Sequence, residues 1–452
     1  SWATEVKYIK DGKDVIDSRF QFKLKDYWGN WETVDATPRT SDGQLLFLME
    51  MVDKMKPASA NKIGSKIASV HNGSSLFTGD AGSGESNIRR YIIENDLLDA
   101  IVQLPNNMFY NTGITTYIWL LNNNKPKERQ GYVQLLDANN LYQKLRKNLG
   151  MKNCELTASH IDEIKTAYLK NLEESTEGSD LKIKRFKNSD FGYYKVNIER
   201  PKRLRSQFTE EALADLRFDK SLAVPMQTLY NTYGEEVYQG LVEEESAIYK
   251  RAEKEDWGLN KKQIAKLVDT ATWQKPKAIY DAALTLWSHV GDDVFMDFNA
   301  FSSLVDDVVK NNKIGIGAAE KKTILNAIST YDATAEKVIK KVEKLSGDKL
   351  DQLLNKLGCT VDELPFFGYY PTEKPGEFIT YETESDLRDS EQISLNEEIL
   401  SYYQREVYPH VEEAWINLDS VKIGYEISFN KYFYQHTPLR SIEAITADLL
   451  SL

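Results

Sequence analysis

Four short apolar runs between residues 66 and 138 constrain the fold of this chain more than any other feature. Their content of β-branched and aromatic residues predicts buried strands. The runs are KIASVHN (66–72), LLDAIVQLP (97–105), TTYIWLLNN (115–123) and YVQLLDA (132–138). Apolar residues at helical spacing precede the first run, between Asp42 and Pro57, and follow it from Ser86. Strands that alternate with helices predict a mostly parallel sheet, and the short turn NKPKERQG predicts an antiparallel edge.

The rest of the chain divides into segments of different composition. Residues 1–40 are expected to form a loop-like N-terminal segment, and residues 41–205 contain the sheet. Residues 206–357 are amphipathic helical patterns with charged faces, and residues 358–452 mix Pro, Gly and aromatics before a last helical pattern. A length of 452 residues suits several domains, so we expect an α/β fold followed by a helical domain.

Composition excludes several classes of protein. The formal net charge is −12, which argues against a free-standing nucleic-acid binder, because phosphate attraction needs clustered Lys and Arg. Nucleic acid would have to be held locally or with a partner's help. The two cysteines, Cys154 and Cys359, are too few for a disulfide framework or a thiolate metal cage. With no run of 18 apolar residues, no membrane span is expected, and a cytoplasmic location fits.

The glycine-rich turn at residues 79–84 suggests a nucleotide-binding loop. A dinucleotide fingerprint needs a third glycine where Asn87 stands, and a P-loop needs Gly-Lys-Ser/Thr, which is absent. Gly315 and Gly317 fail the same test. A nucleotide-dependent oxidoreductase built on this loop would also need an acidic partner for the ribose, so we predict a structural turn.

No metal site or nucleophile is predicted. The histidines have no second His or Cys at ligand spacing, and they are His71, His160, His289, His410 and His436. His71, at the end of a predicted strand, is expected to be packed or hydrogen-bonded. No Ser, Cys or Thr stands in a nucleophile elbow.

The most informative element is QLPNNMFYNTGITTYIWLL, residues 103–121. Phe109 and Tyr110 stand between two predicted strands and are followed by Asn111, Thr112 and Gly113. Loops at strand ends are where α/β proteins bind ligands, and an aromatic face there can stack on a nucleobase. Phe109 could equally cap the core, and the residues alone leave both alternatives open.

Several blocks of this sequence closely resemble the modification subunit of type I restriction–modification systems. These proteins are DNA adenine-N6 methyltransferases that use S-adenosylmethionine. The blocks are SDGQLLFLMEMVDKMKP, VHNGSSLFTGDAGSGESNIRRYIIENDLLDAIVQLP, MFYNTGITTYIWLLNNNKP, VQLLDA, FGYYKVNIERPKRL, REVYPHVEEAWIN and IGYEISFNKYFYQHTPLRSIE. The resemblance implies that residues 41–205 are part of a methyltransferase catalytic domain, the C-terminal part of a class I (Rossmann-like) sheet.

The resemblance also implies roles for the loop residues. The aromatic that matches Phe109 is expected to stack on an adenine flipped out of the duplex, with Tyr110 as the second choice. Asn111, Thr112 and Gly113 would belong to the pocket loop. Flipping is needed because the exocyclic amine is unreachable within the base stack.

Two motifs of the resembled proteins are missing. Their catalytic motif is Asn/Asp-Pro-Pro-Phe/Tyr, but this sequence has no Pro-Pro pair, and the glycine-rich cofactor motif is absent as well. The chain also begins without Met and ends in mid-pattern. We therefore expect a downstream part of such a subunit that, alone, neither binds S-adenosylmethionine appreciably nor methylates DNA.

Partners follow from the resemblance. A specificity subunit would supply DNA sequence recognition and contact the C-terminal segment 358–452. A restriction subunit and double-stranded DNA would join the assembled complex, which would account for an acidic chain. The alternative is a non-catalytic, methyltransferase-like scaffold whose helical region binds protein.

Overall fold

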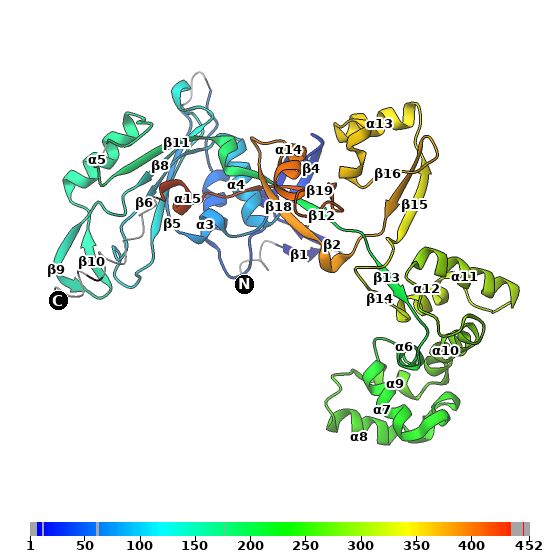
Figure 1. Cartoon of the computed structure of the whole chain (residues 1–452). Helices are drawn as coiled ribbons and strands as arrows, with labels where there is room; N and C mark the ends of the chain where they lie inside the picture. The colour runs from blue at the N-terminus through cyan, green and yellow to red at the C-terminus, as the bar shows by residue number, and fades with distance from the viewer. Residues whose placement is uncertain (1–6, 11–12, 60–62, 177, 435–445, 447–452) are drawn as a thin grey trace. The chain divides into compact units, whose positions relative to one another are not determined.

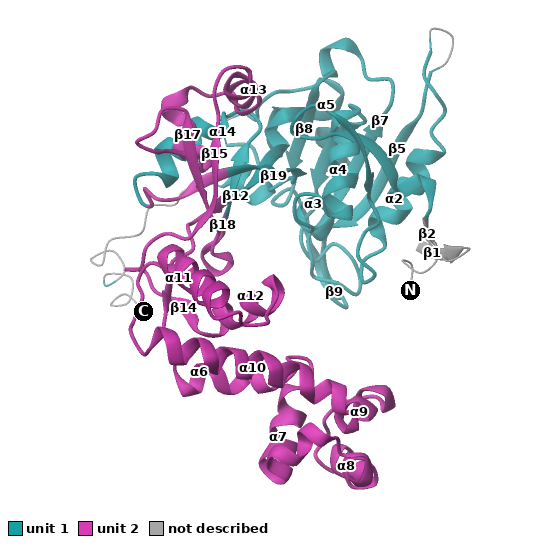
Figure 2. Cartoon of the chain, turned by 90° about the vertical axis from the view of Figure 1, so that its right-hand side faces the viewer, with its two compact units in different colours: residues 1–197, 390–410, 417–452 teal, residues 198–389, 411–416 magenta. Residues whose placement is uncertain are grey.

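The chain folds into two compact units (Figures 1 and 2). The computed structural model describes residues 7–10, 13–59, 63–176, 178–434 and 446. Unit 1 comprises residues 1–197, 390–410 and 417–452, and unit 2 comprises residues 198–389 and 411–416. The candidate site lies in unit 1.

The main sheet of unit 1 is mixed. Its strand order is β11-β8-β6-β7-β5. The strands are β5 (Lys66–Asn72), β6 (Leu98–Gln103), β7 (Thr116–Asn122), β8 (Tyr132–Asp137) and β11 (Lys182–Lys187). Only the neighbours β6 and β8 are parallel, while β5–β7, β6–β7 and β8–β11 are antiparallel. The prediction of a mostly parallel sheet was therefore wrong, although both edge strands are antiparallel to their neighbours.

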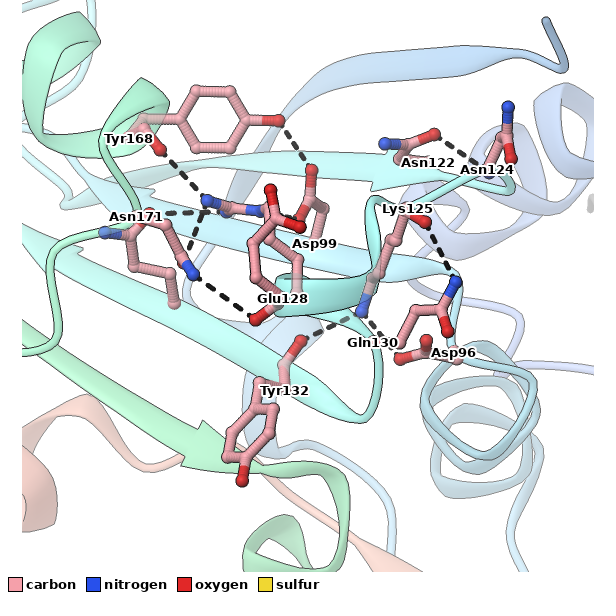
Figure 3. Close-up of polar contacts among 12 residues, drawn as sticks. Asp96, Asp99, Asn122, Asn124, Lys125, Glu128, Gln130, Tyr132, Tyr168 and Asn171 are labelled. Atoms are coloured by element: carbon pink, nitrogen blue, oxygen red, sulfur yellow. Dashed lines mark hydrogen bonds and ion pairs between the residues drawn. The ribbon is translucent and has the colours of Figure 1, made fainter.

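The route from β7 to β8 explains the difference. The turn NKPKERQG was expected to bring these strands together, but β6 lies between them. The Lys125 ammonium donates to Asp96 Oδ1 at 2.7 Å, and Arg129 Nε donates to Asp99 Oδ1 at 2.6 Å. Asp96 precedes β6 and Asp99 lies within it, so these ion pairs lead the turn across the start of β6 to its far side (Figure 3).

Arg129 is the centre of a buried polar cluster. Its guanidinium donates to the Tyr168 carbonyl and to Asn171 Oδ1, each at 2.9 Å, and it lies 4.6 Å from the centre of the Tyr168 ring. The Tyr168 hydroxyl donates to Asp99 Oδ2 at 2.6 Å (Figure 3). The cluster thereby fastens α5 (Ala158–Leu169) to the sheet.

Side-chain alternation divides the apolar residues between the two faces of the sheet. On one face, Ile101 and Trp119 pack against α2 (Gln44–Asp53), α3 (Ser74–Phe77) and α4 (Gly84–Glu94). On the other face, Val102 and the residues around it pack against α5. Ile101 and Val102 are consecutive, and successive side chains of a strand point to opposite faces.

The N-terminal segment is more regular than expected. Residues 1–40 were predicted to be loop-like, but β3 (Gln21–Lys25) and β4 (Trp31–Asp35) form an antiparallel hairpin, after the shorter β1 (Lys7–Lys10) and β2 (Lys13–Ile16). Phe22 and Leu24 are buried, while the residues between and beside them are exposed. This period of two suits a strand packed on one face.

A smaller sheet of order β18-β12-β19 lies largely within unit 1. It comprises β18 (Asp389–Ser394), β12 (Gly192–Glu199) and β19 (Trp415–Tyr425). After β19, α15 (Phe429–Phe433) places Phe429 5.1 Å from the ring of Tyr117 in the main core. The C-terminal part of the chain thus completes the core that the β5–β8 region begins.

Unit 2 is mainly helical. The helices are α6 (Glu210–Ala214), α7 (Ala223–Tyr233), α8 (Glu245–Lys254), α9 (Lys261–Val268), α10 (Thr270–Val290), α11 (Phe298–Asn311), α12 (Ala318–Ala327) and α13 (Asp348–Leu357). One core surrounds Trp273 and another surrounds Phe301. The strands of unit 2 are β13 (Leu204–Ser206), β14 (Ser329–Tyr331), β15 (Ile339–Lys344), β16 (Tyr370–Pro371) and β17 (Glu377–Tyr381). No helix in the described part of the chain is both long and apolar enough to cross a membrane.

Candidate functional site

The predicted site loop begins at the edge of the sheet where three strands end. β5 and β6 are each antiparallel to β7, so they run in the same direction, and β8 is parallel to β6. The carboxyl ends of all three therefore meet at one edge, which is where ligands bind in open α/β sheets. Residues 104–115 join β6 to β7 at this edge and contain all five predicted site residues.

The aromatic pair points to solvent. Phe109 is 36% exposed and Tyr110 is 60% exposed. Met108, the residue before them, packs against the apolar core on the α5 side, and Leu104 is buried there. Met108 rather than Phe109 thus covers this end of the core.

Short-range contacts give the loop its shape. Phe109 and Thr112 form an isolated antiparallel bridge, so Tyr110 and Asn111 occupy the tip of a tight turn. The Ile114 amide donates to Thr112 Oγ1 at 3.3 Å. A Cβ at Gly113 would lie 2.7 Å from Asn107 Oδ1 and 3.2 Å from Met151 Cε, so a larger residue here would displace these side chains.

A second hairpin, β9 (Gln143–Leu149) and β10 (Lys152–Glu155), holds the loop from outside. The Met151 amide donates to the Tyr110 carbonyl at 3.0 Å, and the Asn153 amide donates to the Asn107 carbonyl at 3.1 Å. The Lys152 ammonium donates to the Met108 carbonyl at 3.1 Å and lies 5.7 Å from the centre of the Tyr110 ring.

Cys154 adds a further contact to the loop. Its thiol donates to the Asn106 carbonyl at 3.1 Å, and burial raises the pKa of this thiol. The hairpin was missed from the sequence, although Gly150, with φ +63°, marks its turn. The site loop is therefore braced at several carbonyls, which favours a fixed aromatic surface.

His71 lies near the same edge but is packed. It is 4% exposed, and its ring meets Trp119 edge-on at 5.7 Å. Both ring nitrogens lack a hydrogen-bond partner among the residues that the structure describes, and burial lowers the pKa of His71 to about 4. Within the described residues, no group of three or more His, Cys, Asp or Glu side chains could hold a metal ion.

The glycines of the glycine-rich turn lie close to other parts of the chain. A Cβ at Gly84 would lie 1.9 Å from the Thr37 carbonyl oxygen, and one at Gly82 would lie 3.1 Å from Lys422. Its glycines thus make room for the chain's own atoms. A cavity of about 730 Å³ lies beside the turn, and Asp80, paired with Lys195, forms part of its wall.

Comparison with known proteins places the site in a defined family region. Residues 13–207 match the family model described as N-6 DNA Methylase. The chain is related to the methylase subunits of type I restriction enzymes. It is 30% identical over 166 residues to the methylase subunit of the type I restriction enzyme MjaIX from Methanocaldococcus jannaschii, covering 36% of this chain and 27% of that protein. It is 31% identical over 140 residues to the HindI methylase subunit from Haemophilus influenzae, covering 30% of this chain and 29% of that protein.

The resemblance to type I modification subunits is thereby confirmed: the relatives are named methylase subunits of type I restriction enzymes, and the matching family model is described as N-6 DNA Methylase. The chain spans less than a third of the length of these two relatives. Among solved structures, a type I methyltransferase subunit from Streptococcus thermophilus aligns at 21% identity and a TM-score of 0.28, covering 36% of this chain and 29% of that one. The matched region 13–207 includes the main sheet, the site loop and the β9–β10 hairpin.

Proposed function

We propose that this chain is part of a type I restriction–modification methyltransferase subunit. The intact enzyme would transfer a methyl group from S-adenosylmethionine to N6 of adenine in double-stranded DNA. It would act in the cytoplasm within a complex that contains a specificity subunit and, in the full assembly, a restriction subunit. The relatives' names and the N-6 DNA methylase region support this proposal.

The observation that carries the proposal is the exposed Phe109–Tyr110 pair on a braced loop at the carboxyl edge of the sheet. An enzyme that modifies a base within a duplex must flip it out and hold it. Stacking on an aromatic side chain contributes roughly 1–3 kcal/mol per base. A loop fixed by the β9–β10 hairpin would lose little freedom on binding, which favours affinity.

Individual roles follow from the loop geometry. Phe109 is the proposed stacking surface, and Tyr110 is the second choice because its ring lies beside Lys152 at the turn. Asn111 and Thr112 would line the pocket loop with polar groups. Gly113 would keep the turn close to Asn107.

S-adenosylmethionine would be the methyl donor of the intact enzyme. S-adenosylmethionine supplies an activated methyl group when bound. The sequence has no Pro-Pro pair, and Gly84 of the glycine-rich turn lies against the Thr37 backbone. We therefore expect this chain alone not to bind S-adenosylmethionine tightly or to methylate DNA, and calorimetry that found tight binding would contradict this.

The architecture is assigned on the same basis. We propose that the main sheet is the C-terminal part of a class I methyltransferase sheet, in which β7 runs antiparallel between β6 and β5. Residues 41–205 would be the partial catalytic domain, residues 206–357 a helical domain, and residues 358–452 a segment for subunit interaction.

The test is Phe109→Ala in the intact subunit, assembled with its partner subunits. Methyl transfer from radiolabelled S-adenosylmethionine to a DNA duplex should fall, while cofactor binding stays nearly unchanged, because only the base contact is lost. Phe47→Ala is the matched control, since Phe47 is 55% exposed on α2, outside the loop. Equal turnover of both variants would remove the assignment of Phe109.

The alternative function is a non-catalytic, methyltransferase-like scaffold. The missing catalytic and cofactor motifs favour it for the chain as written. An intact subunit that binds its partner subunits but never methylates DNA, with or without Phe109, would support the scaffold instead.

A further inference from the structure

The β9–β10 hairpin differs in charge from the rest of the chain. Between Asn139 and Cys154 there are four cationic residues and no Asp or Glu, whereas the whole chain carries −12. The four are Lys144, Arg146, Lys147 and Lys152. Such a concentration of one sign gives a local positive potential within an acidic protein.

Only one of these cations is used by the fold. Lys152 is half-buried and donates to the Met108 carbonyl. Lys144, Arg146 and Lys147 are exposed, and none of them has an ion pair or side-chain hydrogen bond with another described residue. Their charge is therefore available to an external anion.

The hairpin is hydrogen-bonded to the site loop. Its turn contacts Tyr110 through the Met151 amide, and Leu149 and Met151 are 46% and 54% exposed there. The strand that carries Lys144, Arg146 and Lys147 is β9, which pairs with β10, and residues 151–153 contact the site loop. The cations therefore belong to the same hairpin that braces the proposed base-stacking pair.

We propose that the β9–β10 hairpin binds the phosphate backbone of double-stranded DNA next to the flipped base, with Lys144 and Arg146, which share one face of β9, as the phosphate contacts. The proposal rests on the proposed function, because it takes duplex DNA as the substrate. Residues two apart in a strand are separated by roughly 7 Å, while one DNA strand carries a phosphate about every 3.4 Å of helix axis. Lys144 and Arg146 can therefore meet different phosphates.

This contact would explain how a chain with a net negative charge can approach DNA. Phosphate contacts position a protein on the duplex without reading sequence, which suits a subunit whose sequence recognition comes from a partner.

The experiment compares two double variants in the assembled complex. Lys144→Gln/Arg146→Gln removes the two cations on one face of β9 and keeps Lys147 and Lys152. Lys250→Gln/Lys261→Gln makes the same charge change at exposed positions of α8 and α9. Affinity for a fluorescein-labelled duplex with the recognition sequence is measured from about 50 to 200 mM salt.

The hairpin variant should lower the magnitude of the slope of log affinity against log salt by about 1.8, since each lost phosphate contact accounts for about 0.9. The control variant should keep the wild-type slope. Equal slopes for wild type and hairpin variant, or equal losses in both variants, would overturn the proposal, as would a wild-type complex that binds no duplex.

Methyl transfer by the same complexes separates the two proposals. Absent transfer by the wild type with a slope change in the hairpin variant would overturn the proposed function and leave the hairpin contact standing. Normal transfer with unchanged slopes would overturn only the hairpin contact.

Discussion

Replacing Arg129 by methionine should strongly destabilise unit 1. Arg129 and Asp99 form an ion pair at 2.6 Å with side chains 8% and 1% exposed. Without Arg129, the Asp99 carboxylate stays buried with the Tyr168 hydroxyl as its remaining hydrogen-bond donor in the cluster. Breaking a buried pair by removing one partner costs about 3–5 kcal/mol.

The assay is urea unfolding followed by hydrogen exchange in peptides from β6 and β8, which reports on unit 1 alone. Arg185→Met is the control, because its partner Glu173 is 66% exposed and such surface pairs contribute about 0–1 kcal/mol. The double variant Asp99→Asn/Arg129→Met should regain part of the loss, since no uncompensated charge remains. A loss for Arg129→Met no larger than that for Arg185→Met would refute the role given to the ion pair.

Two further predictions concern packing and pH. Gly84→Ala should lower the free energy of unfolding by about 1–3 kcal/mol, because its Cβ would meet the Thr37 carbonyl oxygen at 1.9 Å. Gly315→Ala is the control, since a Cβ there would meet no atom within 4 Å, and it should leave thermal unfolding nearly unchanged. His71 has a folded pKa of about 4, below the 6.5 of the unfolded chain, so protonation of this ring favours the unfolded state. The contribution of neutral His71 to the free energy of unfolding is therefore complete above pH 6.5 and falls as the pH drops towards 4. His71→Phe should therefore flatten the loss of stability across that window in pH-dependent denaturation, and an unchanged profile would contradict the buried neutral ring.

Local patterns predicted the strands better than their pairing. The four apolar runs are present as β5, β6, β7 and β8. Their order depends on Lys125 and Arg129, which meet Asp96 and Asp99 through space, and periodicity does not encode such contacts. The length of the turn NKPKERQG is compatible with a hairpin, so the sequence predicted that β7 and β8 are neighbours.

The site was visible in part. An aromatic pair between two strands marked the loop, and its exposure agrees with a surface available for stacking. The role of Phe109 stays a prediction. The bracing hairpin was missed because QKLRKNL is nearly all polar and exposed, so it lacks the apolar alternation of a packed strand.

The most direct measurement of the central claim is photo-cross-linking. A duplex with 5-iodouracil in place of the target adenine is irradiated with the assembled complex, and the linked peptide is identified by mass spectrometry. The account predicts a cross-link to Phe109 or Tyr110. Efficient cross-linking only to peptides outside residues 104–115 would contradict the claim that this loop receives the flipped base.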